Sequence, residues 1–484
     1  MTVRNMVALS KYVTVLLAVT GSGIALGQSP VAHPVLPDAP GRRQIAEVFT
    51  APNAPARAML PGQSSGDSPA VPSANRNPKL TRMDAEQMAI KNNPRVSVGR
   101  LLALAQHEVV RETRAAELPT ASASITAVDA KDASRISAGS LTASRLFEHA
   151  GAGGGFTQLI TDFGKTRSLV AYSKLQEKAQ NANALATQED IVIATDQAFY
   201  NALEAQALLN VAQQNVSTRH TTQSQVSEMT KNKLKSTLDL SFANVNSSQA
   251  QLLLLDAQNN AESAMAALDA VLGLDRQVAY ELVEVDTDLE APSPDVDRLI
   301  EAGLQDRPDL QALTFSEQAA VKFSHAQRDQ MFPSISAAGT LGSVPIRPQQ
   351  YYVSNWWGGI GVNMNIPVFN GFLYSAQAKE AAIRAQAASE QSRDLRDRIV
   401  RDIRTSWLAA NAAFQRVSVS AELLKQADLA LSLAQTRYRM GLSSIVELSQ
   451  AQYQQTDAAI GNTNAQYQYR LALATLDYQI GAKP

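Results

Sequence analysis

The strongest constraint on this chain comes from two stretches of about 65 residues that contain no proline, residues 165–229 and 374–439. Both are rich in alanine and glutamine and follow a helical pattern. A helix of that length measures about 100 Å, whereas helices in globular proteins average about 11–12 residues. It is stable only where neighbouring helices cover it along its length, and alanine permits that close approach. We therefore predict a frame of long, closely packed helices.

The two stretches belong to a tandem duplication. Pro94 and Pro119 lie 25 residues apart, and so do Pro308 and Pro333, at an offset of 214 residues. Further along the chain the offset is 208, so the first copy has six more residues between these landmarks. The pairs that match at 208 are Asp162 with Asn370, Leu234 with Leu442, Asp239 with Glu447, Leu268 with Leu476, Asp269 with Asp477, and Gly273 with Gly481.

The duplication predicts one repeat over residues 81–290 and a second over residues 293–484. Each repeat reads as two helices, a strand hairpin, a very long helix and a return helix. The hairpins are predicted at residues 119–163 and 333–369. The second repeat is predicted to begin its first helix at Ser293-Pro294, since proline is favoured at the first helical position.

The second hairpin contains the clearest strand pattern. Residues 356–369 alternate between apolar side chains and small or polar ones, which is the period of a strand. A barrel strand that crosses lipid needs about 9–11 residues with aromatics at the interface, and a half-buried strand of an ordinary sheet fits the same pattern. Trp356 and Trp357 are therefore candidate membrane-interface anchors, with packing in a core as the alternative.

The N-terminal part of the sequence indicates that the protein is exported from the cytoplasm. Residues 1–27 combine basic residues, a short apolar run and small residues, which is the layout of a secretory signal peptide. Residues 28–80 hold ten of the 20 prolines among Ser, Ala and Gly, and predict a flexible segment. No later segment offers the roughly 18 uninterrupted apolar residues of a spanning helix. Entry into a membrane would therefore require a barrel.

Composition excludes several classes of function. Because the chain has no cysteine, we expect no disulfide, no thiolate metal site, no cysteine nucleophile and no lipid anchor on an N-terminal cysteine. The five histidines are scattered, so no metal site is expected. The net charge is −2 and no basic stripe carries aromatics, so no nucleic-acid partner is expected. No triad, phosphate loop or isolated carboxylate pair indicates an enzyme, and no cofactor is expected.

Each long helix is followed by a short break and a return helix. Ser236 and Ser444 are the predicted N-caps of the return helices. Asp239 and Glu447 each follow three residues later, which would complete a capping box in both repeats.

In this order, the landmarks resemble the TolC-like outer-membrane efflux and secretion family, the outer membrane factors, over about residues 81–484. The resemblance rests on the duplication and on motifs in both halves: Asn93-Pro94 and Arg307-Pro308-Asp309, Leu118-Pro119 and Phe332-Pro333, Ile366-Pro-Val-Phe-Asn-Gly371, and Tyr438-Arg-Met-Gly441-Leu-Ser-Ser-Ile-Val-Glu447. It implies a fold that is mainly α with a β-barrel part. The long helices would form a hollow periplasmic α-barrel, and each subunit of a homotrimer would give four strands to one twelve-stranded barrel in outer-membrane lipid.

The function that the resemblance implies is passive conduction, without catalysis. The chain would be the exit duct of a tripartite efflux or type I secretion system in a Gram-negative-type cell. It would dock on a periplasmic adaptor (membrane fusion) protein that works with an inner-membrane transporter. Small drugs, metal ions and secreted proteins are all compatible cargoes.

The resemblance also implies where contacts lie. The two helix-turn tips would meet the adaptor through Lys233, Leu234, Lys235 and Ser236 in the first tip and Gly441, Leu442 and Ser443 in the second. Lys233 departs from the family pattern, because it stands where the second tip has glycine. The family narrows near the tips, so a candidate pore constriction is formed by the carboxylates of Glu228, Glu422 and Asp428. Solvated loops and outward-facing charges are the alternative interpretations.

The strand count gives a separate reason for oligomerisation. Four strands are too few to close a lipid-spanning barrel, because known barrels start near eight. Two copies would give eight strands and three would give twelve, and the residues alone permit both, whereas the resemblance selects three. A soluble periplasmic coiled-coil adaptor or scaffold is the alternative function, because long helices and a signal peptide fit it too.

Overall fold

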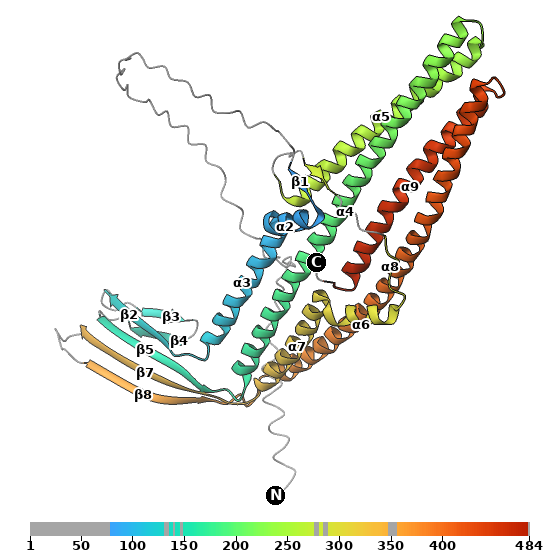
Figure 1. The fold of residues 1–484 in the computed structure, drawn as a ribbon. Coiled ribbons are helices and arrows are strands. Elements are labelled where there is room, and N and C mark those ends of the chain that lie inside the picture. Colours follow the sequence, from blue (N-terminus) through green and yellow to red (C-terminus); the bar gives the residue numbers. More distant parts are fainter. Residues whose placement is uncertain are drawn as a thin grey trace, which may run out of the picture. The chain divides into compact units, whose positions relative to one another are not determined.

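The computed structural model describes residues 78–129, 135–138, 141–145, 149–274, 280–283, 289–346 and 356–482. The predicted signal peptide and all but the end of the proline-rich segment lie outside these residues. The first repeat contains α2 (Arg82–Asn92), α3 (Pro94–Ala115), α4 (Lys165–Lys231) and α5 (Thr237–Leu272). The second contains α6 (Val296–Asp306), α7 (Pro308–Asp329), α8 (Leu373–Arg439) and α9 (Ile445–Gln479). The predicted fold class, mainly helical with two very long helices, is confirmed: α4 and α8 have 67 residues each (Figure 1).

Small residues repeated every seven positions explain how these helices pack. The spacing of seven keeps one seam of a helix facing its neighbour, and alanine lets the backbones approach closely. α4 packs against α5 and α7, and α8 packs against α9 and α7. The buried residues with this spacing are Ala243, Ala250 and Ala257 in α5, Ala312, Ala319 and Ala326 in α7, Ser420, Ala427 and Ala434 in α8, and Ala451, Ala458 and Ala465 in α9.

Both predicted hairpins contribute to one antiparallel sheet at the start of the long helices (Figure 1). Its strands are β2 (Thr120–Val128), β5 (His149–Thr161), β7 (Ser334–Ile346) and β8 (Trp356–Asn365), in the order β2-β5-β7-β8. The two repeats therefore meet through the β5–β7 pair. The first hairpin also contains a separate two-stranded sheet, β3 (Arg135–Ala138) with β4 (Leu141–Arg145), which the sequence pattern did not predict.

Regular structure begins earlier than predicted. β1 (Lys79–Leu80) pairs in parallel with β6 (Glu281–Leu282), so the last residues assigned to the proline-rich segment form a strand. Leu80 is only 2 % exposed and packs in a core cluster with Leu282 and Leu268. The contact joins residues about 200 positions apart, and local patterns carry no information about it.

The helix caps follow the expected chemistry with two exceptions. Ser236 and Asp239 form the complete capping box. Ser444 accepts a hydrogen bond from the Glu447 amide, but the Glu447 carboxylate lies 3.2 Å from Arg437 Nε and does not return to the cap. The expected second box is therefore half formed, because an arginine at the end of α8 competes for its carboxylate. The predicted helix start at residues 293–294 is also wrong, since Asp295 caps α6 and the helix begins at Val296.

Gly273 and Gly441 allow a matched test of the helix ends. Both have positive φ, 70° and 75°, a conformation that costs a residue with a Cβ about 1–2 kcal/mol. A Cβ at Gly273 would also lie 2.9 Å from the Asn92 carbonyl oxygen, whereas Gly441 has nothing within 4 Å. We expect Gly273→Ala to destabilise the protein by at least about 1 kcal/mol more than Gly441→Ala. Denaturant unfolding followed by helical circular dichroism measures this, and equal losses would contradict it.

Candidate functional site

The two tips, α4–α5 and α8–α9, have the same backbone geometry. In the first, the Lys233 and Leu234 amides donate to Thr230 and Met229 carbonyls at 2.9 and 2.8 Å. In the second, the Gly441 and Leu442 amides donate to the carbonyls of the corresponding residues, Tyr438 and Arg437, at 3.1 and 2.8 Å. These paired bonds define a Schellman-type helix end, whose turn residue is left-handed. Lys233 departs from glycine in residue type but adopts the same conformation, with φ 61° against 75°.

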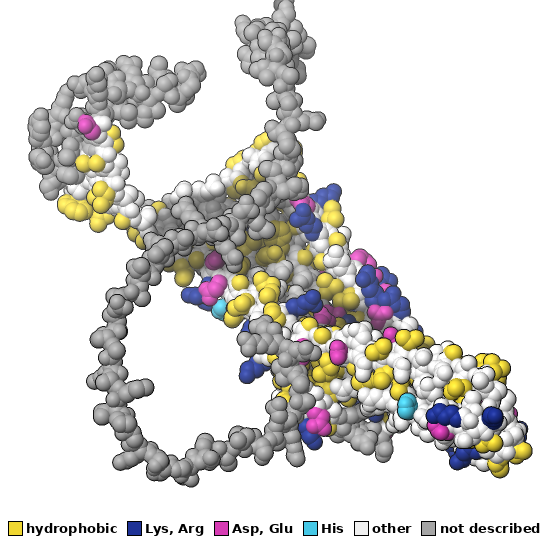
Figure 2. All heavy atoms as spheres, turned by 90° about the horizontal axis from the view of Figure 1, so that it is seen from above, with side chains coloured by type: hydrophobic (Ala, Val, Ile, Leu, Met, Phe, Trp, Pro, Cys, Tyr) yellow, Lys and Arg dark blue, Asp and Glu magenta, His cyan; other side chains and the backbone are white. Residues whose placement is uncertain are grey.

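Each tip presents a leucine to solvent. Leu234 is 73 % exposed and Leu442 is 65 % exposed, with Met440 beside the second at 61 %. Apolar and basic surfaces lie next to each other at the end of the molecule that carries the tips (Figure 2). Exposed leucines on a turn held by backbone hydrogen bonds are suited to burial against a partner.

The tips also contact each other through a pair that the sequence analysis did not identify. The Lys235 ammonium of the first tip lies 4.2 Å from the centre of the Tyr438 ring, at the end of α8. Tyr438 is 4 % exposed and packs with Val226, Ile445 and Leu448. Burial, with a smaller effect of the Asp239 charge, raises the pKa of its hydroxyl. The two helical hairpins are therefore joined near their ends by a cation–π contact over a small apolar core.

The four-stranded sheet has two chemically different faces. Residues paired across strands share a face, so the register assigns the faces directly. One face is mainly apolar, with Gln158 and Ser343 as polar exceptions: Ala121, Ala123, Ile125, Phe156, Ile335, Leu341, Trp356, Ile360, Val362 and Met364. The other carries mainly hydroxyls, amides and glycine, with Leu159 and Trp357 as apolar exceptions: Ser122, Ser124, Thr126, Thr157, Ser336, Thr340, Gly361, Asn363 and Asn365. Among these residues neither face has a charged side chain.

The register separates the two tryptophans that were predicted as a pair of anchors. Neighbouring residues of a strand point to opposite faces, so Trp356 lies on the apolar face and Trp357 on the polar one. Trp357 packs on Gly342, where an added Cβ would lie 3.0 Å from Trp357 Cζ2. Trp356 stays a candidate interface anchor, and the position of Trp357 does not support that role.

The structure does not bring the three predicted constriction carboxylates together in one chain. Glu228 on α4 is 2.7 Å from Lys231 Nζ. On α8, Glu422 accepts from Gln426 at 2.7 Å, and this bond together with Lys425 lowers the pKa of Glu422. Asp428 accepts from Gln455 of α9 at 3.0 Å. All three are exposed, so their role in a ring stays a prediction about an assembly.

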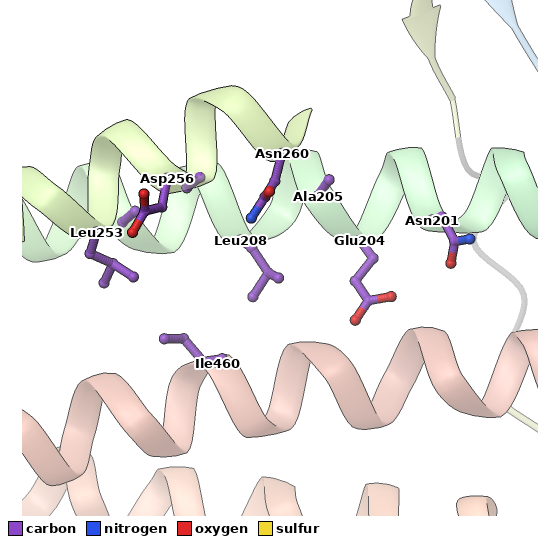
Figure 3. Close-up of a pocket in the computed structure, with 10 residues that line it drawn as sticks. Asn201, Glu204, Ala205, Leu208, Leu253, Asp256, Asn260 and Ile460 are labelled. Carbon is purple, nitrogen blue, oxygen red and sulfur yellow. The ribbon is translucent and has the colours of Figure 1, made fainter. Parts of the chain in front are cut away.

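A cavity of about 210 Å³ lies between α4, α5 and α9. Its lining is mostly apolar and includes Leu208, Leu253 and Ile460, with the Glu204 carboxylate turned toward α9 (Figure 3). Burial raises the pKa of Glu204.

The described residues contain no group of three His, Cys, Asp or Glu side chains placed to hold a metal ion. Within that same part of the chain, no helix combines the length and apolar character needed to cross a membrane.

Known proteins share the sequence pattern and the arrangement of helices and sheet described above. The family model described as "Outer membrane efflux protein" matches residues 86–274 and 299–482. The outer membrane protein TolC of Salmonella enteritidis is 24 % identical over 341 residues, 67 % of each chain. Among solved structures, the channel-forming protein CusC superposes with a TM-score of 0.74 at 17 % identity, covering 83 % of this chain and 92 % of that one.

A second solved structure gives the same result. The outer membrane protein VceC from Vibrio cholerae superposes with a TM-score of 0.71 at 19 % identity, covering 83 % of this chain and 96 % of its own. The structural likenesses show that the chain shares the fold of these proteins, and the family model spans both repeats. The chain belongs to the outer membrane efflux protein family.

Proposed function

We propose that this chain is the exit duct of a tripartite efflux or type I secretion system, working as a homotrimer in the outer membrane and reaching into the periplasm. It conducts cargo passively and carries out no catalysis. The observation that carries the proposal is the four-stranded sheet with one apolar and one polar face. Ile360 and Val362 on the apolar face are 80 and 69 % exposed. A soluble adaptor would expose this apolar face to water, whereas a barrel strand would cover it with lipid.

The sheet's free edges support assembly with other copies. β2 and β8 are the end strands of the sheet, so each has a row of backbone groups unpaired in the described chain. In hydrocarbon each such group costs several kcal/mol, and closure of a barrel removes the edges. Joining β8 of one copy to β2 of the next would pair them. Three copies give the twelve strands of the family's barrel, with the apolar face toward lipid and the polar face lining the lumen.

The tips support a partner in the periplasm. Leu234 and Leu442 are the side chains that a periplasmic adaptor would bury, and Lys233, Lys235, Ser236, Gly441 and Ser443 complete the surface. Burying a leucine is worth about 1.5–3 kcal/mol, and a trimer repeats the contact three times. The adaptor would connect the duct to an inner-membrane transporter. In the same trimer, Glu228, Glu422 and Asp428 would form carboxylate rings that favour cations.

The barrel predicts a labelling pattern in β8. Since the chain has no cysteine, single thiols can be followed directly. Gly361 lies on the polar face with open space for a Cβ, and its neighbour Ile360 lies on the apolar face. We expect a membrane-impermeant maleimide to label Gly361→Cys in outer membranes and to spare Ile360→Cys until the protein is denatured. Equal labelling of the two variants in membranes would contradict the barrel.

The tip surface predicts the effect of a charge at Leu442. Leu442→Glu should abolish export, because docking would bury an unpaired carboxylate, while trimers still assemble on native gels. Leu442→Met, which keeps an apolar side chain, should retain at least about half of the activity. Export is measured as drug resistance or secreted cargo in a strain that lacks the native duct. Full export by Leu442→Glu would exclude the tip as the docking surface.

The carboxylate ring predicts a change in ion selectivity. Asp428→Asn removes the charge but keeps an oxygen that can accept from Gln455, whereas Asp428→Ala removes both. If the charge acts on ions in the pore, both variants should lower cation selectivity of the purified channel in planar bilayers, about equally. A change in Asp428→Ala alone would indicate a structural role, and no change in either would remove Asp428 from the constriction.

A further inference from the structure

A group of buried ionisable side chains lies where α2 packs against α4. Glu86 of α2 is 5 % exposed and Asp196 of α4 is 4 % exposed. Arg82, one turn before Glu86, serves both: its Nη1 lies 2.9 Å from Glu86 Oε1 and donates to Asp196 Oδ2 at 3.2 Å. One guanidinium nitrogen therefore faces two carboxyl groups from two different helices.

If Glu86 and Asp196 are both ionised, their two negative charges face the single positive charge of Arg82, and a buried carboxylate oxygen is left without a hydrogen-bond donor. Asp196 Oδ1 is buried and accepts no hydrogen bond within the described residues, whereas Glu86 Oε1 faces the same Arg82 guanidinium that donates to Asp196 Oδ2. A third carboxyl, Asp477 of α9, lines the same cavity as Arg82 and Asp196. Buried carboxylates without donors cost several kcal/mol, and two that lie together cannot both ionise cheaply.

We propose that Asp196 holds a proton up to about neutral pH and donates it in a hydrogen bond to Glu86, and that this proton is part of what holds α2 on α4. The proton makes the buried Asp196 carboxyl, whose Oδ1 has no partner, a donor. It also leaves one negative charge on the pair, which Arg82 balances.

The surrounding groups determine how Asp196 titrates. Burial, followed by the hydrogen bond and charge of Glu86, raises the pKa of Asp196 to about 7, and Arg82 opposes the shift. Burial also raises the pKa of Asp477. Other ionisable groups around the pair are Glu189 and Tyr200 of α4 and Tyr478 of α9. None of these groups adds a second permanent cation.

The second repeat shows that this docking does not require carboxyl groups. α6 corresponds to α2 at the offset of 214, and the position that matches Glu86 is Ile300. Ile300 packs with Ile399 and Ile403 of α8 in an apolar cluster. The first repeat thus has a titratable contact where the second has an apolar one, which makes α2 pH-sensitive and α6 its internal reference.

The sign of the pH effect follows from the raised pKa. An unfolded Asp titrates near 3.9, so the contact is fully stabilised below about pH 4. Stability is lost as pH rises, until Asp196 ionises at about pH 7. Above that pH, α2 should open more often and expose the core around Leu80 and Ala85.

Hydrogen exchange of the purified full chain in detergent tests the proposal between pH 5 and pH 9, after correction for intrinsic exchange rates. We expect protection of α2 amides to fall on the order of 10- to 100-fold across the range, while α6 amides stay constant. Asp196→Asn supplies a permanent amide donor and should remove the pH dependence of α2. Asp477→Asn, the matched control, should keep it. Constant protection of α2 in the wild-type chain, or the same slope in Asp196→Asn, would overturn the proposal.

Infrared spectroscopy gives a second readout that does not depend on a variant folding. The wild-type protein should show the carbonyl band of a protonated carboxylic acid at pH 6 that disappears as pH rises through about 7. Asp196→Asn should lack this component of the band. Absence of the component from the wild-type chain at pH 6 would equally overturn the proposal.

Discussion

Close packing between small side chains is the interaction on which the rest of this structure depends. α4 and α8 are far longer than a helix can sustain alone, and each is covered by neighbours along its length. Alanine and serine at every seventh position of α5, α7, α8 and α9 bring the backbones together. This frame places the sheet at one end of the long helices and the two tips at the other, which is the arrangement that a duct needs.

The duplication provides the same parts twice, but the two copies are used differently. Both tips have one turn geometry, although Lys233 stands in the first where Gly441 stands in the second. The first return helix has a complete capping box and the second has half of one. The docking of α2 on α4 uses carboxyl groups, whereas that of α6 on α8 uses isoleucines. Under the proposed protonation of Asp196, only the first of these two contacts responds to pH.

Long and periodic features could be predicted from the residues. Two proline-free stretches and the alternation of residues 356–369 were enough for the long helices and the clearest strand, and the duplication with its paired motifs was enough for the family. Short elements were missed: β1 with β6, and β3 with β4, have too few residues for a pattern to stand out. The start of α6 was placed two residues early, because Asp295 competes with Pro294 as the boundary signal and provides the capping oxygen.

Sequence by itself determined what depends on neighbours along the chain: helix length, strand period, turn type and the repeat. Tertiary structure decided what depends on residues far apart, because side-chain partners come from other helices and strands. Only the register shows that Trp356 and Trp357 lie on opposite faces of a sheet joining both repeats. Only packing brings Lys235 over Tyr438, and Glu86 beside Asp196, where burial changes the proton affinity of a carboxyl group that looks ordinary in the sequence.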